Sequence, residues 1–288
     1  MGGRVLLIGG AGLVGRHVRA ALGDRDVVVT FHSDPIEGGI PLDITDAAAV
    51  RACIAKTAPD TIVFAAAQPY VEACESDPSG TWRVNVEAPA IARLAAPDAN
   101  LVVFSSEYVF DGARGPYRET DPVAPINAYG LQKVALEELA ASAPRHLVLR
   151  ISGVFGEEAQ RKNFVWQLVD RLRGGKTFDV PSDQVITPTD AATLATAVVE
   201  LIDRGAAGTF HAAGPEIMGR VEFARLVARA FGLDDVLIVP RPTAELGLKA
   251  KRPAHAGLSD EKLRVAIGHG LRAPAAVLAD LARDDRPR

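Results

Sequence analysis

The sequence is short of cysteine, of basic charge and of long apolar runs, and each shortage excludes a class of protein. Two cysteines, Cys53 and Cys74, cannot build the framework of several disulfides that stabilises small secreted domains. The formal net charge of −4 leaves no basic excess for a nucleic-acid surface. The apolar run 61–67 is far shorter than the ~20 residues of a membrane-spanning helix. We therefore expect a cytoplasmic protein without nucleic-acid or membrane partners.

Hydrophobic residues make up 48% of the 288 residues, which is enough for one large core or two joined ones. Strand-like and helix-like stretches alternate through the first half. We expect strands at 5–8, 27–31, 61–66, 101–105 and 147–151, and helices at 14–22, 47–56, 80–96 and 129–142. This alternation is typical of βαβ units, so the sequence predicts an α/β fold with a doubly wound parallel sheet of the Rossmann type.

The second half has a less regular pattern. Helices are expected at 164–173, from a cap at Thr189 to about 203, at 221–231 and, as the last helix, at 260–267, with a strand at 209–212. Thr45 is the expected cap of the helix at 47–56. We expect an NAD(P)-binding Rossmann domain over 1–150 with a return segment at about 183–212. Residues 151–182 and 213–288 would then form a smaller α/β substrate-binding domain.

A glycine-rich turn joins the first expected strand to the first expected helix. Gly9, Gly12 and Gly15 have the G-x-x-G-x-x-G spacing, and Leu13 and Val14 open the helix. Glycine lets the chain turn tightly, approach a pyrophosphate and pack strand against helix, while the helix N-terminus favours phosphate. An ordinary strand-to-helix turn could carry the same glycines, but the βαβ setting favours a dinucleotide.

The end of the second expected strand lacks the Asp or Glu that usually bonds the ribose 2′-hydroxyl of NAD, and no carboxylate follows until Asp34. His32 and Ser33 stand there instead, and both could donate to a 2′-phosphate. The sequence therefore favours NADPH, with NADH as the alternative if these two residues only form an exposed loop. Asp43 could accept from the adenine amino group, or it could only cap a turn.

Three further residues indicate chemistry on a carbonyl group. Tyr129 and Lys133 are four residues apart in a helical stretch, so their side chains share one face. An ammonium about 4 Å away would lower the pKa of the phenol by up to roughly 3, toward neutral pH. Ser106 follows a strand at its carboxyl end, where open α/β sheets bind ligands, and its hydroxyl could donate to a developing oxyanion. A chance Tyr-x-x-x-Lys pair is common, but the three residues in this order are specific.

The order of these motifs resembles the extended short-chain dehydrogenase/reductases, and more closely the dTDP-4-dehydrorhamnose reductase (RmlD-like) family. Residues 105–112 resemble that family's S-T-D-Y-V-F-D-G signature, and other matches occur at 116–121, 127–130, 163–164, 183–184, 188–189 and 252–253. The resemblance implies an NADPH-dependent reductase, 4-ketoreductase-like, acting on a keto group of a nucleotide-linked, dTDP-type deoxysugar.

The resemblance also implies roles for individual residues. It makes Ser106, Tyr129 and Lys133 a catalytic triad, with Tyr129 and Lys133 also beside the cofactor. Further cofactor residues would be Ile44, Ala65, Ala66, Ala67, Ser105, Ile151 and Val154. Substrate residues would be Glu107, Tyr108, Gly153, Asn163, Gln184 and Arg252. Asn85 would be a structural or proton-relay residue, or else a plain residue of a helix surface.

Five positions depart from the family pattern, and one of them is Ser106, where the relatives often carry a Thr. Gly153 stands where those reductases carry a Trp over the hexose, Ile186 replaces a Gly, and Glu107 replaces an Asp. These departures indicate a remodelled sugar pocket. His17 stands where some relatives use a Glu to bind a metal between subunits, so no metal is predicted.

Two other functions would use the same motifs. A non-catalytic, NADP-binding regulatory subunit of the methionine adenosyltransferase type would keep the loop and the triad without turnover. A sugar-nucleotide epimerase would hold NAD permanently. The sequence permits a homodimer, and it specifies neither the sugar nor the nucleotide; a non-sugar ketone is also allowed.

Overall fold

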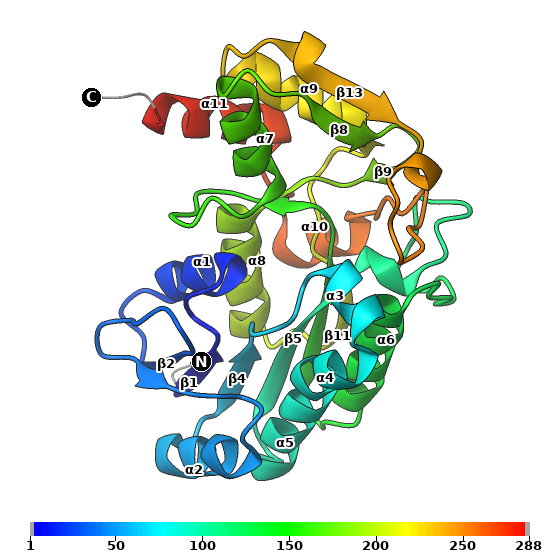
Figure 1. The fold of residues 1–288 in the computed structure, drawn as a ribbon. Helices are drawn as coiled ribbons and strands as arrows, with labels where there is room; N and C mark the ends of the chain where they lie inside the picture. The colour runs from blue at the N-terminus through cyan, green and yellow to red at the C-terminus, as the bar shows by residue number, and fades with distance from the viewer. Residues whose placement is uncertain (1–2, 286–288) are drawn as a thin grey trace.

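The computed structural model describes residues 3–285, and its centre is a seven-stranded sheet (Figure 1). The strand order is β11-β6-β5-β4-β1-β2-β3, and every neighbouring pair is parallel. The strands are β1 Val5–Ile8, β2 Val27–Phe31, β3 Ile40–Pro41, β4 Thr61–Phe64, β5 Asn100–Ser106, β6 His146–Ile151 and β11 Gly208–His211. The predicted doubly wound parallel sheet is confirmed.

Helices cover both faces of this sheet. One layer holds α1 Leu13–Leu22, α8 Ala191–Asp203 and α10 Glu261–Ile267. The other holds α2 Ala47–Thr57, α5 Ala88–Ala95 and α6 Ala128–Ala141. Successive strand residues point to opposite layers, so Leu7 and Val102 pack in the first and Leu6 and Leu101 in the second. Burial on both faces explains why the strands have continuous apolar runs instead of alternating ones.

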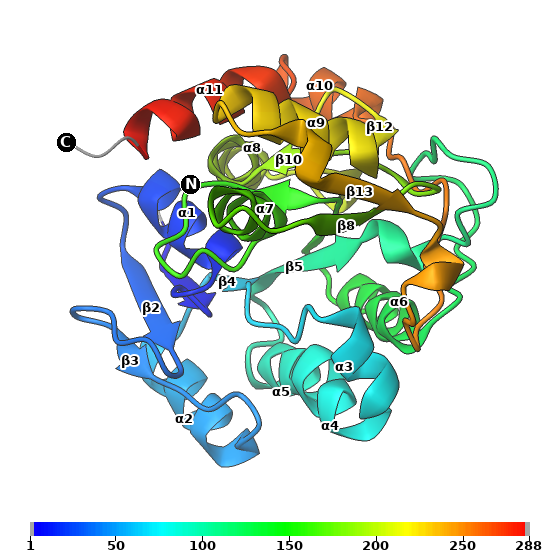
Figure 2. The ribbon, with the colours of Figure 1, turned by 45° about the horizontal axis from the view of Figure 1, so that its top comes forward.

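A smaller lobe lies beside the large sheet and has its own apolar core (Figure 2). Its helices are α7 Phe164–Arg173, α9 Arg220–Ala230 and α11 Pro274–Asp284. Its short strands are β8 Phe178–Pro181, β9 Val185–Ile186, β12 Met218–Gly219 and β13 Ile238–Arg241, paired as β13-β8 and β12-β9. A third pair, β7 Val154–Phe155 with β10 Thr189–Asp190, joins the two lobes. Trp166, Phe223 and Leu278 are buried in the core of this lobe.

The helix expected at 80–96 is broken into three pieces. α4 Pro78–Trp82 is followed by one π-helical turn, η1 Arg83–Glu87, and then by α5. α3 Val71–Ser76 precedes them, and short 3-10 turns occur at η2 Glu107–Val109, η3 Asp235–Leu237 and η4 Thr243–Glu245. A π turn inserts an extra residue into the helical repeat, which a 3.6-residue periodicity does not reveal.

Two predicted caps are each displaced by one residue. Asp46, instead of Thr45, accepts from the N–H groups of Ala48 and Ala49 at the start of α2. Asp190, instead of Thr189, accepts from the N–H of Thr193 at the start of α8. Thr and Asp are adjacent in both cases and both make good caps, so composition alone could not choose between them.

The C-terminal segment differs from prediction in two ways. α10 is not the last helix, because α11 follows it. Leu263 and Ile267 of α10 pack in the core of the large sheet, although the sequence predicts that 213–288 belongs to the substrate domain.

The expected return segment at about 183–212 also differs from prediction, because Ile186 packs in the core of the smaller lobe and not in that of the large sheet. The chain crosses between lobes more often than its sequence pattern indicates.

Within residues 3–285, no helix is both long enough and apolar enough to cross a membrane.

Candidate functional site

A cavity of about 360 Å³ opens where β1, β2 and β4 end. Nine of the predicted cofactor residues line it: Gly9, Gly12, His32, Ser33, Asp43, Ile44, Ala65, Ala66 and Ala67. These residues come from the four loops that follow β1, β2, β3 and β4, which the parallel sheet brings to one edge. Open α/β sheets bind their ligands at this edge.

The glycines of the first loop have different reasons to be glycine. Gly9 has φ +90°, and a Cβ on it would lie 2.6 Å from the backbone nitrogen of Ala66. A Cβ on Gly15 would lie 2.1 Å from the carbonyl oxygen of Gly9, so Gly15 lets α1 pack on the loop. Gly12 has no such crowding, since its nearest neighbour would be 3.7 Å away. It lines the cavity and precedes α1 without a side-chain cap, so the first N–H groups of α1 are available to phosphate.

Asp43 holds a turn, one of the two roles that its sequence position allowed. It lines the cavity, and its Oδ1 accepts from the N–H and the hydroxyl of Thr45 at 2.8 and 2.7 Å. These hydrogen bonds lower the pKa of Asp43. His32 and Ser33 are exposed at the rim of the same cavity, as a contact with a 2′-phosphate requires.

Ser106, Tyr129 and Lys133 converge at the end of β5. Ser106 is the last residue of β5, and α6 packs against that strand with Tyr129 in its first turn. The Lys133 ammonium lies 5.5 Å from the centre of the Tyr129 ring and donates to the carbonyl of Phe104 at 2.8 Å. Ser106 and Lys133 are buried and Tyr129 is half-buried. The spacing that suggested one shared face is therefore realised.

The expected lowering of the phenol pKa by Lys133 is wrong for this structure. Burial raises the pKa of Tyr129 well above its usual value, the Glu107 carboxyl raises it further, and a hydrogen bond with Ser106 opposes the rise. Burial also lowers the pKa of Lys133 to about 8. Burial is the largest cause of both shifts, and it favours the uncharged form of each group.

Glu107 lies directly beside the triad. It is 7% exposed, and its Oε2 accepts from the Ser106 hydroxyl at 2.8 Å. Burial raises the pKa of this carboxyl, and the Ser106 hydrogen bond opposes the rise. A serine hydroxyl has one proton to donate, so Ser106 can donate to a substrate oxygen only after it releases Glu107.

Arg220 is a residue that the sequence patterns missed. It opens α9 of the smaller lobe, and its guanidinium lies 3.5 Å from Gln184 Oε1 and 5.3 Å from the centre of the Phe164 ring. Its charge acts on Glu107 and Tyr108, since it lowers the pKa of each against the larger effect of burial. Its buried Nε has no hydrogen-bond partner among residues 3–285. A helix-starting arginine has no motif around it, so only the fold reveals this donor.

Arg252 and Tyr108 meet across the lobes, as expected for substrate residues. Arg252 donates to the Tyr108 hydroxyl at 3.3 Å and forms an ion pair with Glu72 of α3 at 2.8 Å. The Tyr108 ring packs edge-on against Tyr129, with centroids 5.6 Å apart. The Arg252 guanidinium therefore has one carboxylate partner. An anionic substrate that binds Arg252 would have to share the guanidinium with Glu72 or displace Glu72 from it.

Gly153 and Ile186, two of the departures from the family pattern, are neighbours. Gly153 is exposed with φ +52°, and a Cβ on it would lie 3.2 Å from Ile186 Cδ1. Ile186 thus fills the space beside Gly153 that a larger side chain at 153 would need.

Several predicted site residues have structural roles instead. The Asn163 amide caps α7 and donates to Gly156 O and Glu158 Oε2, both at 3.1 Å, so neither end of it is left for substrate. The Ser105 hydroxyl donates to Glu137, which is held in a buried ion pair with Arg150. Eight of the predicted cofactor residues do not line the cavity. Three belong to α1, two pack against the sheet core, and three are the residues described above at β5 and α6: Leu13, Val14 and Gly15; Ile151 and Val154; Ser105, Tyr129 and Lys133.

Asn85 is not a surface residue. It lies in the π-helical turn η1 and is 1% exposed. Its Oδ1 accepts from the N–H of Gln68 at 2.8 Å, and its Nδ2 donates to Gln132 Oε1 at 2.7 Å. It joins α6 to the loop after β4, behind the triad.

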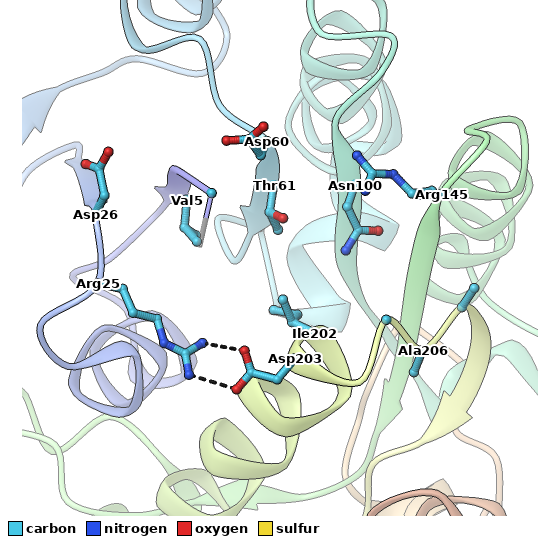
Figure 3. Close-up of a pocket in the computed structure, with 13 residues that line it drawn as sticks. Val5, Arg25, Asp26, Asp60, Thr61, Asn100, Arg145, Ile202, Asp203 and Ala206 are labelled. Atoms are coloured by element: carbon cyan, nitrogen blue, oxygen red, sulfur yellow. Dashed lines mark hydrogen bonds and ion pairs between the residues drawn. The ribbon is translucent and has the colours of Figure 1, made fainter. Parts of the chain in front are cut away.

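A second cavity, of about 520 Å³, lies at the opposite edge of the sheet (Figure 3). Val5, Thr61 and Asn100 line it at the starts of β1, β4 and β5. Arg25 makes a two-bond ion pair with Asp203 at 3.0 and 2.8 Å within its wall. Asp203 pairs with the charge of Arg25, and open parallel sheets bind their ligands at the other edge. We therefore do not assign this second cavity to the functional site. No group of three or more His, Cys, Asp or Glu placed to hold a metal occurs within 3–285.

Comparison with known proteins agrees with this geometry. The family model described as "RmlD substrate binding domain" matches residues 3–285. A dTDP-4-keto-6-deoxy-D-glucose reductase of Streptomyces niveus is 32% identical over 273 residues, which cover 91% of either chain. The methionine adenosyltransferase 2 subunit beta of Danio rerio is 30% identical over 272 residues, covering 91% of this chain and 84% of that one. The crystal structure of a dTDP-4-dehydrorhamnose reductase of Bacillus anthracis in complex with NADP has a TM-score of 0.88 and 25% identity, covering 99% of this chain and 100% of that one.

Proposed function

Because the chain belongs to the family of the RmlD substrate binding domain, we propose that it is an NADPH-dependent reductase of a keto group on a nucleotide-linked, dTDP-type deoxysugar. The observation that carries this proposal is the convergence of Ser106, Tyr129 and Lys133 at the carboxyl end of β5, on the same edge of the parallel sheet as the glycine-lined cavity. The Streptomyces and Bacillus relatives, by their names, carry out this class of reaction.

The cofactor residues follow from the cavity. The N-terminus of α1 behind Gly12 would hold the phosphates, and His32 and Ser33 would hold the 2′-phosphate. Ala65 and Ala66 present small side chains along the cavity wall. When bound, NADPH supplies the hydride that reduces the carbonyl carbon. The fit is supported by Gly12, which lines the cavity at the start of α1 with no side chain in the path of the phosphates.

Tyr129 is the proposed acid. Its raised pKa keeps the proton on the phenol oxygen at neutral pH, ready for transfer to the carbonyl oxygen of the substrate. Ser106 would donate a second hydrogen bond to that oxygen once it turns from Glu107. Lys133, with a pKa of about 8, stands behind Tyr129 as a charged group that favours the phenolate left after transfer.

The substrate would lie between the lobes. Arg220 and Arg252 are positive groups on the smaller-lobe side, and each has donors suited to phosphate or sugar oxygens. We propose the larger lobe as the cofactor domain and the smaller lobe as the substrate domain. We also propose a cytoplasmic location, in keeping with the unpaired, buried Cys53 and Cys74.

Replacing the acid tests the proposal. Tyr129→Phe should lower kcat for dTDP-4-keto-6-deoxyglucose by ~10²–10⁴-fold, the usual contribution of a general acid, while the Kd for NADPH changes by no more than about twofold. NADPH oxidation and calorimetric titration give the two numbers. Tyr70→Phe, at a 55% exposed tyrosine, is the control and should match the parent chain. Full turnover in Tyr129→Phe would remove Tyr129 from this role.

The Danio rerio relative supports a second candidate, an NADP-binding subunit of a methionine adenosyltransferase. That function predicts saturable NADPH binding, no oxidation of NADPH by any keto-sugar nucleotide, and a change in the activity of an added methionine adenosyltransferase. The same titration and turnover assays distinguish it from the reductase.

A further inference from the structure

The segment 156–163, which we call the strap, leaves β7 and lies beside α1 (Figures 1 and 2). Both views show this green segment extending from the smaller lobe to the blue N-terminal part of the large lobe. Its sequence, G-E-E-A-Q-R-K-N, is polar and charged. Nothing in the catalytic proposal uses it.

The base of the strap is firmly held on the smaller lobe. Arg161 has φ +51°, and its guanidinium stacks 4.1 Å above Trp166. The same guanidinium binds Asp170 of α7 and, at 2.9 Å, Asp285. A non-glycine residue in this backbone region is costly, so several contacts must hold it there. The strap is therefore a formed structural element with a defined position.

The far end of the strap contacts the large lobe at two places. Glu157 forms an ion pair with Arg16 of α1 at 3.2 Å, and its carbonyl lies 3.1 Å from His17 Nε2. Gln160 Nε2 donates to Asp34 Oδ2 at 2.5 Å, across 126 residues of sequence. The strap thus reaches the loop after β2, which forms the rim of the cavity.

Asp34 is a carboxylate at the rim of the cofactor cavity. It lines the cavity beside His32 and Ser33. A carboxylate in this loop accepts from the ribose 2′-hydroxyl of NADH and repels the 2′-phosphate of NADPH. Gln160 donates a hydrogen bond to Oδ2 of Asp34, so the strap restricts the position of this carboxylate.

We propose that Gln160 sets the cofactor preference: by binding Asp34, it keeps the carboxylate from the 2′ position of the adenosine ribose, so that His32 and Ser33 bind a 2′-phosphate there. The inference rests on the proposed function, since it concerns the cofactor of that site. Gln160 is a positioning residue, because it acts through Asp34.

The test measures binding of NADPH and NADH by calorimetry, without substrate. Gln160→Ala should raise the Kd for NADPH about fivefold, which corresponds to the ~1 kcal/mol of one hydrogen bond, and should leave the Kd for NADH equal or lower. Asp34→Asn should bind NADPH at least as tightly as the parent chain. Adding Gln160→Ala to Asp34→Asn should then change nothing, because the repelling charge is gone.

Gln167→Ala is the matched control. Gln167 donates to the strap at Lys162 O but has no bond to Asp34, so its loss should leave the ratio of the two Kd values unchanged. Equal weakening of NADPH and NADH by Gln160→Ala would overturn the inference and make the strap a simple cover. So would a loss that persists in the Asp34→Asn background. A parent chain that binds neither dinucleotide would instead refute the proposed function itself.

Discussion

Single residues show how burial alters chemical groups that a motif identifies. Tyr129 and Lys133 have the expected spacing, yet burial moves their pKa values in opposite directions, up for the phenol and down to about 8 for the ammonium. Both shifts favour the uncharged form, as desolvation does. The structure therefore suits a phenol that donates its proton more than one that has already lost it.

A substitution of Arg220 tests the role of a single residue. Arg220→Met keeps the length of the side chain and removes a charge and its donors. If the guanidinium binds an anionic or sugar oxygen of the substrate, the KM for the keto-sugar nucleotide should rise by ~10–100-fold, the effect of losing a charged hydrogen bond of about 1.5–3 kcal/mol. Steady-state kinetics at saturating NADPH give this value.

The control lies on the same helix. Arg225→Met changes an exposed arginine of α9 and should keep the KM of the parent chain. An unchanged KM in Arg220→Met, with an unchanged Kd for the product nucleotide, would exclude Arg220 from the substrate site.

Elements show where sequence patterns suffice and where they do not. The five strands expected in the first half and β11 form as predicted, because fully covered strands leave continuous apolar runs. The sequence does not predict the short strands of the smaller lobe, because a two-residue strand such as Val185–Ile186 is too short to show any periodicity. The π turn at Asn85 likewise has no signature in a single sequence.

The β1–α1 turn gives the prediction at the scale of elements. Gly12→Ala should fold with nearly the parent stability, since the new methyl would lie 3.7 Å from its nearest neighbour, but its Kd for NADPH should rise at least ~10-fold because the methyl occupies the path of the phosphates. Gly15→Ala should instead lose about 1–3 kcal/mol of unfolding free energy, because its methyl would lie 2.1 Å from Gly9 O. Urea unfolding and calorimetric titration separate the two effects.

The opposite pattern would contradict this division of roles: a Gly15→Ala chain as stable as the parent, or a Gly12→Ala chain that binds NADPH normally.

The whole molecule carries a pH dependence through His211 at the end of β11. The residue is fully buried, and its Nε2 lies 3.4 Å from an Arg150 nitrogen. Burial, with the charge of Arg150 as the next cause, lowers the pKa of His211 from 6.5 to about 3. Between these values the unfolded chain binds a proton that the folded chain does not, so the free energy of unfolding falls as the pH falls from 6.5 toward 3.

His211→Gln tests this linkage. The parent chain should lose about 2–3 kcal/mol of unfolding free energy through this group between pH 7 and pH 4.5, at ~1.4 kcal/mol per pH unit below 6.5, and the variant should be spared that loss. Urea unfolding at the two pH values measures it. His269→Gln is the control. A backbone carbonyl and Glu200 raise the pKa of His269, so replacing this residue should not reduce the loss of unfolding free energy at low pH. Equal losses in the parent and His211→Gln would refute the assignment.

The sequence by itself determined the layered α/β sheet, the glycine turn and the shared face of Tyr129 and Lys133. Each of these depends on residues within a few positions of one another, where backbone geometry and hydrophobic periodicity act. Only the tertiary structure decided that Arg220 acts on Glu107, that Arg252 pairs with Glu72, and that Gln160 meets Asp34. Charge and burial depend on which distant segments pack together, and no local pattern encodes that packing.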